Sequence, residues 1–69
     1  MDFEYDCLIG NNIKRLREEK GLTQEQLAAR LQTYGLDITR SGLSKIEIGQ
    51  RHIYSYEIKA IKEILNITY

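Results

Sequence analysis

Residues 21–28 read Gly-Leu-Thr-Gln-Glu-Gln-Leu-Ala and contain the clearest helix start in the chain. Thr23 and Gln26 have the spacing of a capping box, in which the threonine accepts from a backbone N–H and the glutamine reaches back to the N-cap. The residues that follow at the spacing of one helix face are Leu27, Ala28 and Leu31. This stretch predicts a helix that begins at Thr23 and is followed by a loop at residues 32–38.

Apolar periodicity predicts a helix on either side of this central region. The first covers about residues 7–20 and stops at Gly21. Its expected apolar stripe consists of Leu8, Ile9, Ile13 and Leu16. The last helix starts with Ser55 as its cap and runs to about residue 65, and its expected stripe consists of Tyr54, Ile58, Ile61 and Leu65.

Residues 39–48 are predicted to form a short helix with one polar face, with Thr39 as the N-cap and Gly49 as the stop. Its inward residues are Leu43 and Ile46. Gly42 lowers the stability of this helix by up to about 1 kcal/mol relative to alanine, and it is either a tolerated small residue or a site of close backbone approach. The outward residues, which can all donate hydrogen bonds, are Arg40, Ser41, Ser44 and Lys45. Such donors suit base edges in the major groove of DNA.

Two neighbouring segments are candidates for phosphate contacts. The helix that begins at Thr23 has free backbone N–H groups at its start, and Gln24 lies beside them, which is a favourable place for an anion. The segment after the polar helix adds further donors and charge at residues 50–52. The full set of candidate phosphate contacts is Thr23, Gln24, Thr39, Gln50, Arg51 and His52.

The chain is therefore predicted to be all-α, a compact bundle of four or five short helices. Residues 1–7 are interpreted as an acidic N-terminal segment, and residues 8–69 as a single domain. With Cys7 as its one cysteine, the chain cannot form an internal disulfide, which favours a reducing cytoplasm. No apolar run approaches the roughly 20 residues that span a membrane, and the acidic start is unlike a signal sequence.

Catalysis and metal binding are not expected. An active site needs a convergent set of reactive groups, yet the single histidine, His52, and Cys7 lie near opposite ends of the sequence. One cysteine and one histidine also fall short of the usual zinc ligand set. The five glycines are scattered and form no phosphate-binding loop. The sequence thus predicts neither an enzyme nor a bound metal or cofactor.

The charges balance overall but are unevenly distributed. Residues 1–9 carry three acids and no base, whereas residues 10–52 carry eight basic residues against five acidic ones. Nucleic-acid affinity depends on the local field at the docking face, so this central excess is compatible with DNA. The zero total predicts weak non-specific binding. An ordinary mixed surface explains the charges equally well.

Two runs in this order form a fairly specific combination: Gly-Leu-Thr-Gln-x-x-Leu-Ala at residues 21–28 and Ser-x-Leu-Ser-Lys-Ile-Glu-x-Gly at residues 41–49. Together with the residues from Ile13 onward, they resemble the Cro/cI-type (XRE-type) helix-turn-helix family. The likeness extends with the flanking helices over about residues 8–67. It implies a lambda-repressor-like DNA-binding fold with the helix-turn-helix at about residues 23–49.

The resemblance also implies roles for individual residues. It makes residues 39–48 the recognition helix and places Arg40, Ser41, Ser44 and Lys45 at base edges or nearby phosphates. It implies that Gln24 contacts phosphate and braces the start of the recognition helix. It further implies a structural ion pair of Arg17 with Glu47, which would hold the first helix against the end of the recognition helix.

The chain departs from the family pattern at three places. Six residues separate Leu31 from Ile38, an insertion of about five in the usual turn, which could reorient the recognition helix or contact DNA through Thr33 or Tyr34. Ile48 replaces the asparagine that commonly precedes the closing glycine. The sequence also stops at Tyr69, about where the family often has a fifth helix that supports dimerisation.

Two functions remain open at this level. The first is a sequence-specific regulator of transcription, a repressor, that binds a palindromic operator on double-stranded DNA as a homodimer. Such a regulator, of bacterial or phage origin, would be cytoplasmic and nucleoid-associated. The second is a protein-binding module on the same scaffold, such as an anti-repressor or docking domain, which the zero net charge favours. The aromatic residues that could form an interface, or equally the edge of the core, are Phe3, Tyr5, Tyr34, Tyr56 and Tyr69.

Overall fold

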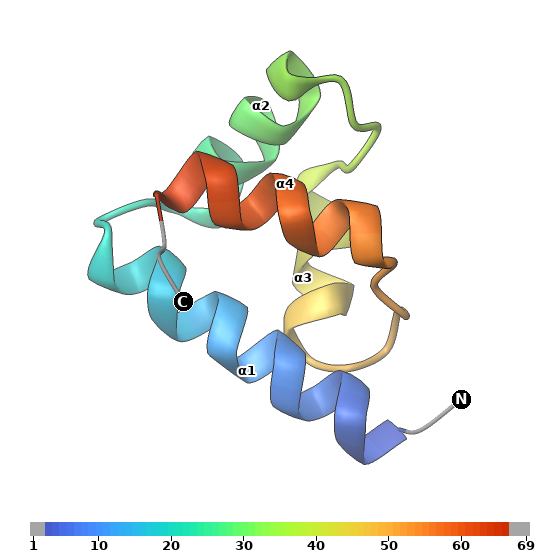
Figure 1. Ribbon diagram of the computed structural model, residues 1–69. Coiled ribbons are helices and arrows are strands. Elements are labelled where there is room, and N and C mark those ends of the chain that lie inside the picture. The colour runs from blue at the N-terminus through green and yellow to red at the C-terminus, as the bar shows by residue number, and fades with distance from the viewer. Residues whose placement is uncertain (1–2, 67–69) are drawn as a thin grey trace.

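A computed structural model describes residues 3–66 of the chain, with side chains from Tyr5 onward. Within these residues there are four helices and no strand: α1 (Phe3–Glu19), α2 (Gln24–Tyr34), α3 (Arg40–Glu47) and α4 (Ser55–Leu65) (Figure 1). The predicted all-α fold is confirmed. The side chain of Phe3 and all of Tyr69, both named as candidate interface aromatics, lie outside the described residues.

Helix α1 begins earlier than the sequence predicted, at Phe3 rather than near Cys7. Asp6 supplies the physical reason, because its buried carboxylate lies 3.1 Å from Nδ1 of His52. This contact ties the first turns of α1 to the loop before α4. At the other end, Gly21 adopts a left-handed φ of 73° and stops the helix, as predicted.

Helix α2 has the predicted capping box at its start. The Thr23 hydroxyl accepts from the Gln26 N–H at 3.0 Å, and the Gln26 side chain accepts from the Thr23 N–H at 2.9 Å. The predicted loop at residues 32–38 is wrong in its first half, because α2 continues to Tyr34 and ends at Gly35, whose φ is 116°. Residues 32–34 contain no helix breaker, so the insertion lengthens α2 by about one turn.

The remaining loop is anchored to the body of the protein, as expected for its apolar residues. Ile38 is 2% exposed, and Leu36 packs against the core from the side. The Gln32 side chain donates to the Ile38 carbonyl at 3.1 Å, and the Tyr34 hydroxyl donates to Glu63 on α4. The inserted segment is therefore tied to α4 through Tyr34, and Arg40, Ser41 and Lys45 on the outward face of α3 are left exposed.

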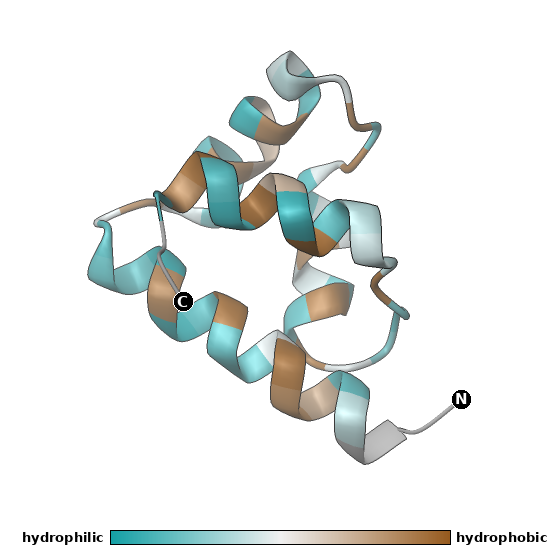
Figure 2. Cartoon of the chain, in the orientation of Figure 1, coloured by the Kyte–Doolittle hydropathy of each residue, from teal (hydrophilic) through white to brown (hydrophobic). Residues whose placement is uncertain are grey.

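One apolar core joins the helices, and α3 packs against both α1 and α2 while α4 packs against α2. Figure 2 shows hydrophobic and hydrophilic residues alternating along α1 and α4, as amphipathic helices require. The buried core consists of Ile13, Leu27, Leu31, Ile38, Leu43, Ile46, Ile53, Ala60, Ile61 and Leu65.

Two predicted members of the apolar stripes are exposed instead. Leu8 is 61% exposed because it lies on the face of α1 opposite Gly10, and Gly10 is the residue that meets α3. Tyr54 is 52% exposed because it is the N-cap of α4 and so stands outside the helix. Ser55, the predicted cap, is instead the first helical residue, since the Glu57 carboxylate accepts from the Tyr54 N–H at 2.9 Å.

Candidate nucleic-acid interface

The N-cap of α3 and its buried residues together determine which side of this helix faces outward. The Thr39 hydroxyl accepts from the Gly42 N–H at 3.1 Å and starts the helix at Arg40. Leu43 and Ile46 are buried and fix which face turns inward. Of the four predicted base-contacting residues, three are exposed and Ser44 is half-buried. None of these four side chains has a hydrogen-bond or ion-pair partner among the described residues.

The charge on this face is positive. Arg40 and Lys45 are exposed, whereas the one carboxylate of α3, on Glu47, is 1% exposed and paired with Arg17. The N-terminus of α3 adds a partial positive charge from its unsatisfied N–H groups. The helix thus presents cations and hydroxyl donors to solvent, and its acid is neutralised inside the protein.

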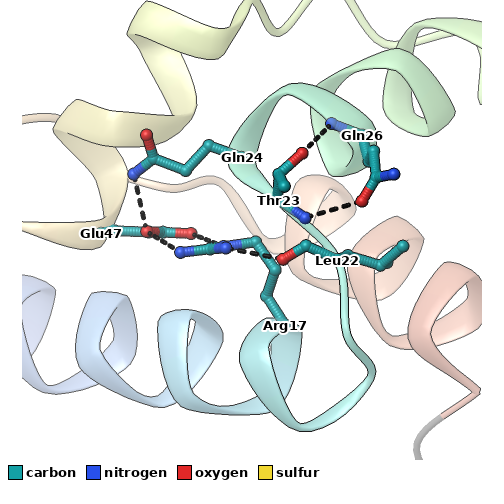
Figure 3. A network of polar contacts seen from close by, with 6 residues as sticks. All are labelled: Arg17, Leu22, Thr23, Gln24, Gln26 and Glu47. Atoms are coloured by element: carbon teal, nitrogen blue, oxygen red, sulfur yellow. Dashed lines mark hydrogen bonds and ion pairs between the residues drawn. The ribbon is translucent and has the colours of Figure 1, made fainter.

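Behind this face lies a buried polar network that joins three helices (Figure 3). Arg17 donates from Nε to one Glu47 oxygen at 2.7 Å and from Nη2 to the other at 3.1 Å. Its Nη1 donates to the Leu22 carbonyl at 2.7 Å. Gln24 on α2 donates to the same carboxylate at 3.0 Å. The ion pair of Arg17 with Glu47 is the one that the family resemblance implied.

The network holds α3 in place and performs no chemistry of its own. Hydrogen bonds from Arg17 to Glu47 raise the pKa of the guanidinium above its ordinary value, so Arg17 stays charged. The prediction that Gln24 braces the start of α3 is wrong in position, because Gln24 contacts Glu47 at the end of that helix. The physical reason is that the last turn of α3 is the part that packs beside the first residue of α2.

A shallow hollow lies beside the start of α2 and brings predicted contact residues together. Its lining includes Thr23, Gln24 and Arg40, together with the acids Glu18 and Glu25. Each capping threonine uses its oxygen as an acceptor, which leaves the O–H as a donor. Gln24 likewise keeps one amide N–H beyond the one that it gives to Glu47. These groups can therefore serve the protein and a bound phosphate at once.

In the segment after α3, residues 50–52, two of the three side chains already form contacts within the protein, which the sequence did not indicate. Gln50 is exposed, but Arg51 forms two hydrogen bonds to Glu57, at 3.1 and 3.0 Å, and also donates to the His52 carbonyl. His52 is held by Asp6. Nothing in the sequence signals these pairs, because their partners lie on α4 and α1.

The pKa of Glu57 is set by opposing effects. Burial raises it, but hydrogen bonds from Arg51 and from the Tyr54 N–H, with the charges of Arg51 and His52, outweigh burial and leave the pKa below its ordinary value. The hydrogen bonds that Arg51 donates to Glu57 raise the pKa of Arg51. Both groups are therefore charged at neutral pH.

Other kinds of site find no support in the part of the chain that the structure describes. No three histidine, cysteine, aspartate or glutamate side chains within residues 5–66 gather so as to hold a metal ion. Among the described helices none is both long and apolar enough to cross a membrane.

Comparison with known proteins decides the family. The model of a family described as helix-turn-helix matches residues 13–69, most of the chain. This chain belongs to the Cro/cI-type helix-turn-helix family. This helix-turn-helix protein is 34% identical over 62 residues to the uncharacterized HTH-type transcriptional regulator y4dJ of Sinorhizobium fredii (strain NBRC 101917 / NGR234), a match that covers 90% of this chain and 74% of that regulator. No solved structure matches it significantly.

The family assignment confirms the predicted class of protein. Helix-turn-helix proteins of this family are DNA-binding regulators of transcription and not enzymes. For this helix-turn-helix protein, the resemblance read from residues 13–49 is therefore correct.

Proposed function

We propose that this protein is a sequence-specific transcriptional repressor that places α3 in the major groove of double-stranded DNA. The observation that carries the proposal is the outward face of α3, where Arg40, Ser41 and Lys45 are exposed and have no partner among the described residues. Long, charged and hydroxyl donors left without protein partners are available for base edges. A compact protein seated at a promoter would repress by excluding other proteins from the same groove.

In this proposal Arg40, Ser41, Ser44 and Lys45 contact base edges. Thr23, Gln24 and Thr39 contact phosphates at the two helix starts, which suits anions because of the free N–H groups there. Gln50 provides a further phosphate contact after α3. Arg51 and His52 keep about a third of their side chains exposed, 32% and 35%, and serve as secondary phosphate contacts that Glu57 and Asp6 position.

We further assign a homodimer on a palindromic operator. Helix α3 has eight residues, a length of about 12 Å, so one copy reads only a few base pairs. The Cα extents of the molecule are 28 × 24 × 20 Å. Two copies therefore fit side by side on half-sites about 34 Å apart, one turn of the double helix.

The test is selection of bound sequences from a random duplex pool, followed by affinity measurements at several salt concentrations. We expect a palindromic consensus and a binding constant that falls steeply with salt, because phosphate contacts release counterions. Lys45→Ala should weaken binding at least tenfold more than Lys59→Ala, which removes the same charge from α4. Equal effects of these two variants would refute docking through α3.

Arg40→Ala should relax preference at one base position and weaken binding by about 1–3 kcal/mol. The check is selection with the variant protein from the same pool. Uniform weakening on all sequences would instead make Arg40 a phosphate ligand.

A protein-binding module, an anti-repressor or docking domain, is the second candidate. Two observations favour it: the net charge of zero, and the exposed, stacked rings of Tyr54 and Tyr56, whose centroids lie 5.9 Å apart. Absence of any duplex binding at low salt would decide for this candidate and against the repressor.

A further inference from the structure

Ile48 is an apolar side chain on an otherwise polar face. It caps α3 with φ −100° and ψ 6°, and its N–H donates to the Ser44 carbonyl at 3.2 Å, so the chain still follows the helical turn here. Counting from Ser41, the residues three, four and seven positions on are Ser44, Lys45 and Ile48. This spacing places all of them on one helix face, opposite the buried residues Leu43 and Ile46.

The exposure of Ile48 has no explanation within the protein. Its side chain is 54% exposed, and an aliphatic group left in water forgoes most of the stabilisation that burial provides. Single exposed apolar residues are common on protein surfaces. Ile48 differs from these by its position, because it extends the same stripe of residues that we assign to base edges.

We propose that Ile48 is a specificity-determining residue that packs against the 5-methyl group of a thymine in the major groove. This inference rests on the proposed function. The thymine methyl is the apolar feature that base pairs present in this groove, and an isoleucine at the end of a row of donors matches it chemically. Neither a phosphate nor a hydrogen-bonding base edge would gain from an aliphatic partner.

The helix geometry also places the contacted thymine. Ile48 lies seven positions after Ser41, which is about 10 Å along the helix axis. The thymine therefore lies at the end of the contacted segment away from the base read by Arg40. The selected half-site should contain a thymine on that side.

The experiment removes the methyl group from the DNA and the side chain from the protein, separately and together. Each thymine of the selected site is replaced in turn by deoxyuridine, which lacks only the 5-methyl group, and the full chain and its Ile48→Ala variant are titrated against each duplex. We expect one deoxyuridine to weaken wild-type binding about fourfold, the equivalent of one buried methylene group. The Ile48→Ala variant should bind the thymine site correspondingly more weakly and be indifferent to that replacement.

Leu8→Ala is the matched control, because Leu8 is an aliphatic residue of similar exposure, 61%, on the far face of α1. It should keep the wild-type sensitivity to deoxyuridine. Two outcomes overturn the role of Ile48 while leaving sequence-specific binding intact. In the first, no deoxyuridine replacement weakens binding by wild type. In the second, the replacement weakens binding equally for wild type and Ile48→Ala. A pool that yields no enriched sequence overturns both proposals.

Discussion

Two arginines of α1, only two residues apart, have very different surroundings. Arg17 is 6% exposed and shares its hydrogen bonds between Glu47 and the Leu22 carbonyl. Arg15 forms a pair with Glu19 at 3.4 Å, but both side chains are more than half exposed. Solvent screens the second pair, whereas breaking the first leaves a charge buried without a partner. These two arginine–glutamate ion pairs therefore differ greatly in their effect on stability, because one is buried and the other is exposed.

Arg17→Ala should lower the free energy of unfolding by about 3–5 kcal/mol, because Glu47 would stay buried and unpaired. Urea denaturation followed by circular dichroism measures the loss. Arg15→Ala, the matched control, should change it by no more than about 0.5 kcal/mol. Equal losses in the two variants would show that the network around Glu47 does not hold the fold.

Glu57 makes stability depend on pH in the acid range. Its pKa is lower in the folded protein than the ordinary value of 4.5, so the unfolded chain takes up a proton first as pH falls. The stabilisation by Glu57 is thus complete well above pH 4.5 and is lost as pH falls below it. Melting temperatures of wild type should fall more between pH 6 and pH 3 than those of Glu57→Gln. Parallel curves would contradict this assignment.

At the scale of elements, the crossing of α1 and α3 depends on the absence of a side chain at Gly10. A Cβ there would lie 2.7 Å from the carbonyl oxygen of Glu47, which is backbone and cannot rotate away. Gly42 on α3 is different, because the nearest atom to an added Cβ is 3.5 Å away. The sequence left two interpretations of Gly42 open. Within the protein, Gly42 is a tolerated small residue, and the close backbone approach occurs at Gly10 instead.

Alanine should therefore have opposite effects at these two helical glycines. Gly10→Ala forces the helices apart at a cost of about 1–3 kcal/mol, which exceeds the gain of up to about 1 kcal/mol in helix propensity. Gly42→Ala should gain the same helix propensity without a steric clash, and should therefore raise the melting temperature. Thermal unfolding of both variants checks the sign, and a stable Gly10→Ala variant would contradict the close crossing.

Helix ends show how far local sequence determines an element. The capping box at Thr23 and the cap at Thr39 were predicted correctly, because each acts within three residues of the chain. The start of α1 was predicted too late, because the contact that secures it comes from His52. The end of α2 was predicted too early, because the buried face ends at Leu31 while the helix itself continues until Gly35.

At the scale of the whole molecule, the hydrophobic core is small and the free energy of unfolding is low. A folded stretch of 69 residues contributes a total stability of about 3–10 kcal/mol. Leu43 is the central buried residue of α3 and is 0% exposed. The same helix therefore supplies both the core and the proposed DNA-binding face, which couples folding to function.

Leu43→Ala should unfold much of the protein at ordinary temperatures, because such a truncation costs about 2–5 kcal/mol. Leu8→Ala, at an exposed position, should change stability by about 0.5 kcal/mol or less. Calorimetry gives both values. An unchanged melting temperature for Leu43→Ala would remove this residue from the core.

The sequence by itself determined that the four described helices form, the threonine caps of α2 and α3, and the polar face of α3, because capping and periodicity act between residues a few positions apart. Only the tertiary structure decided which polar groups remain available to a ligand. Arg51 and His52 look as free in the sequence as Arg40 and Lys45, yet Glu57 and Asp6 hold the first two. The reason is physical: such pairs form where helices cross, and the crossing geometry depends on the packing of the whole core.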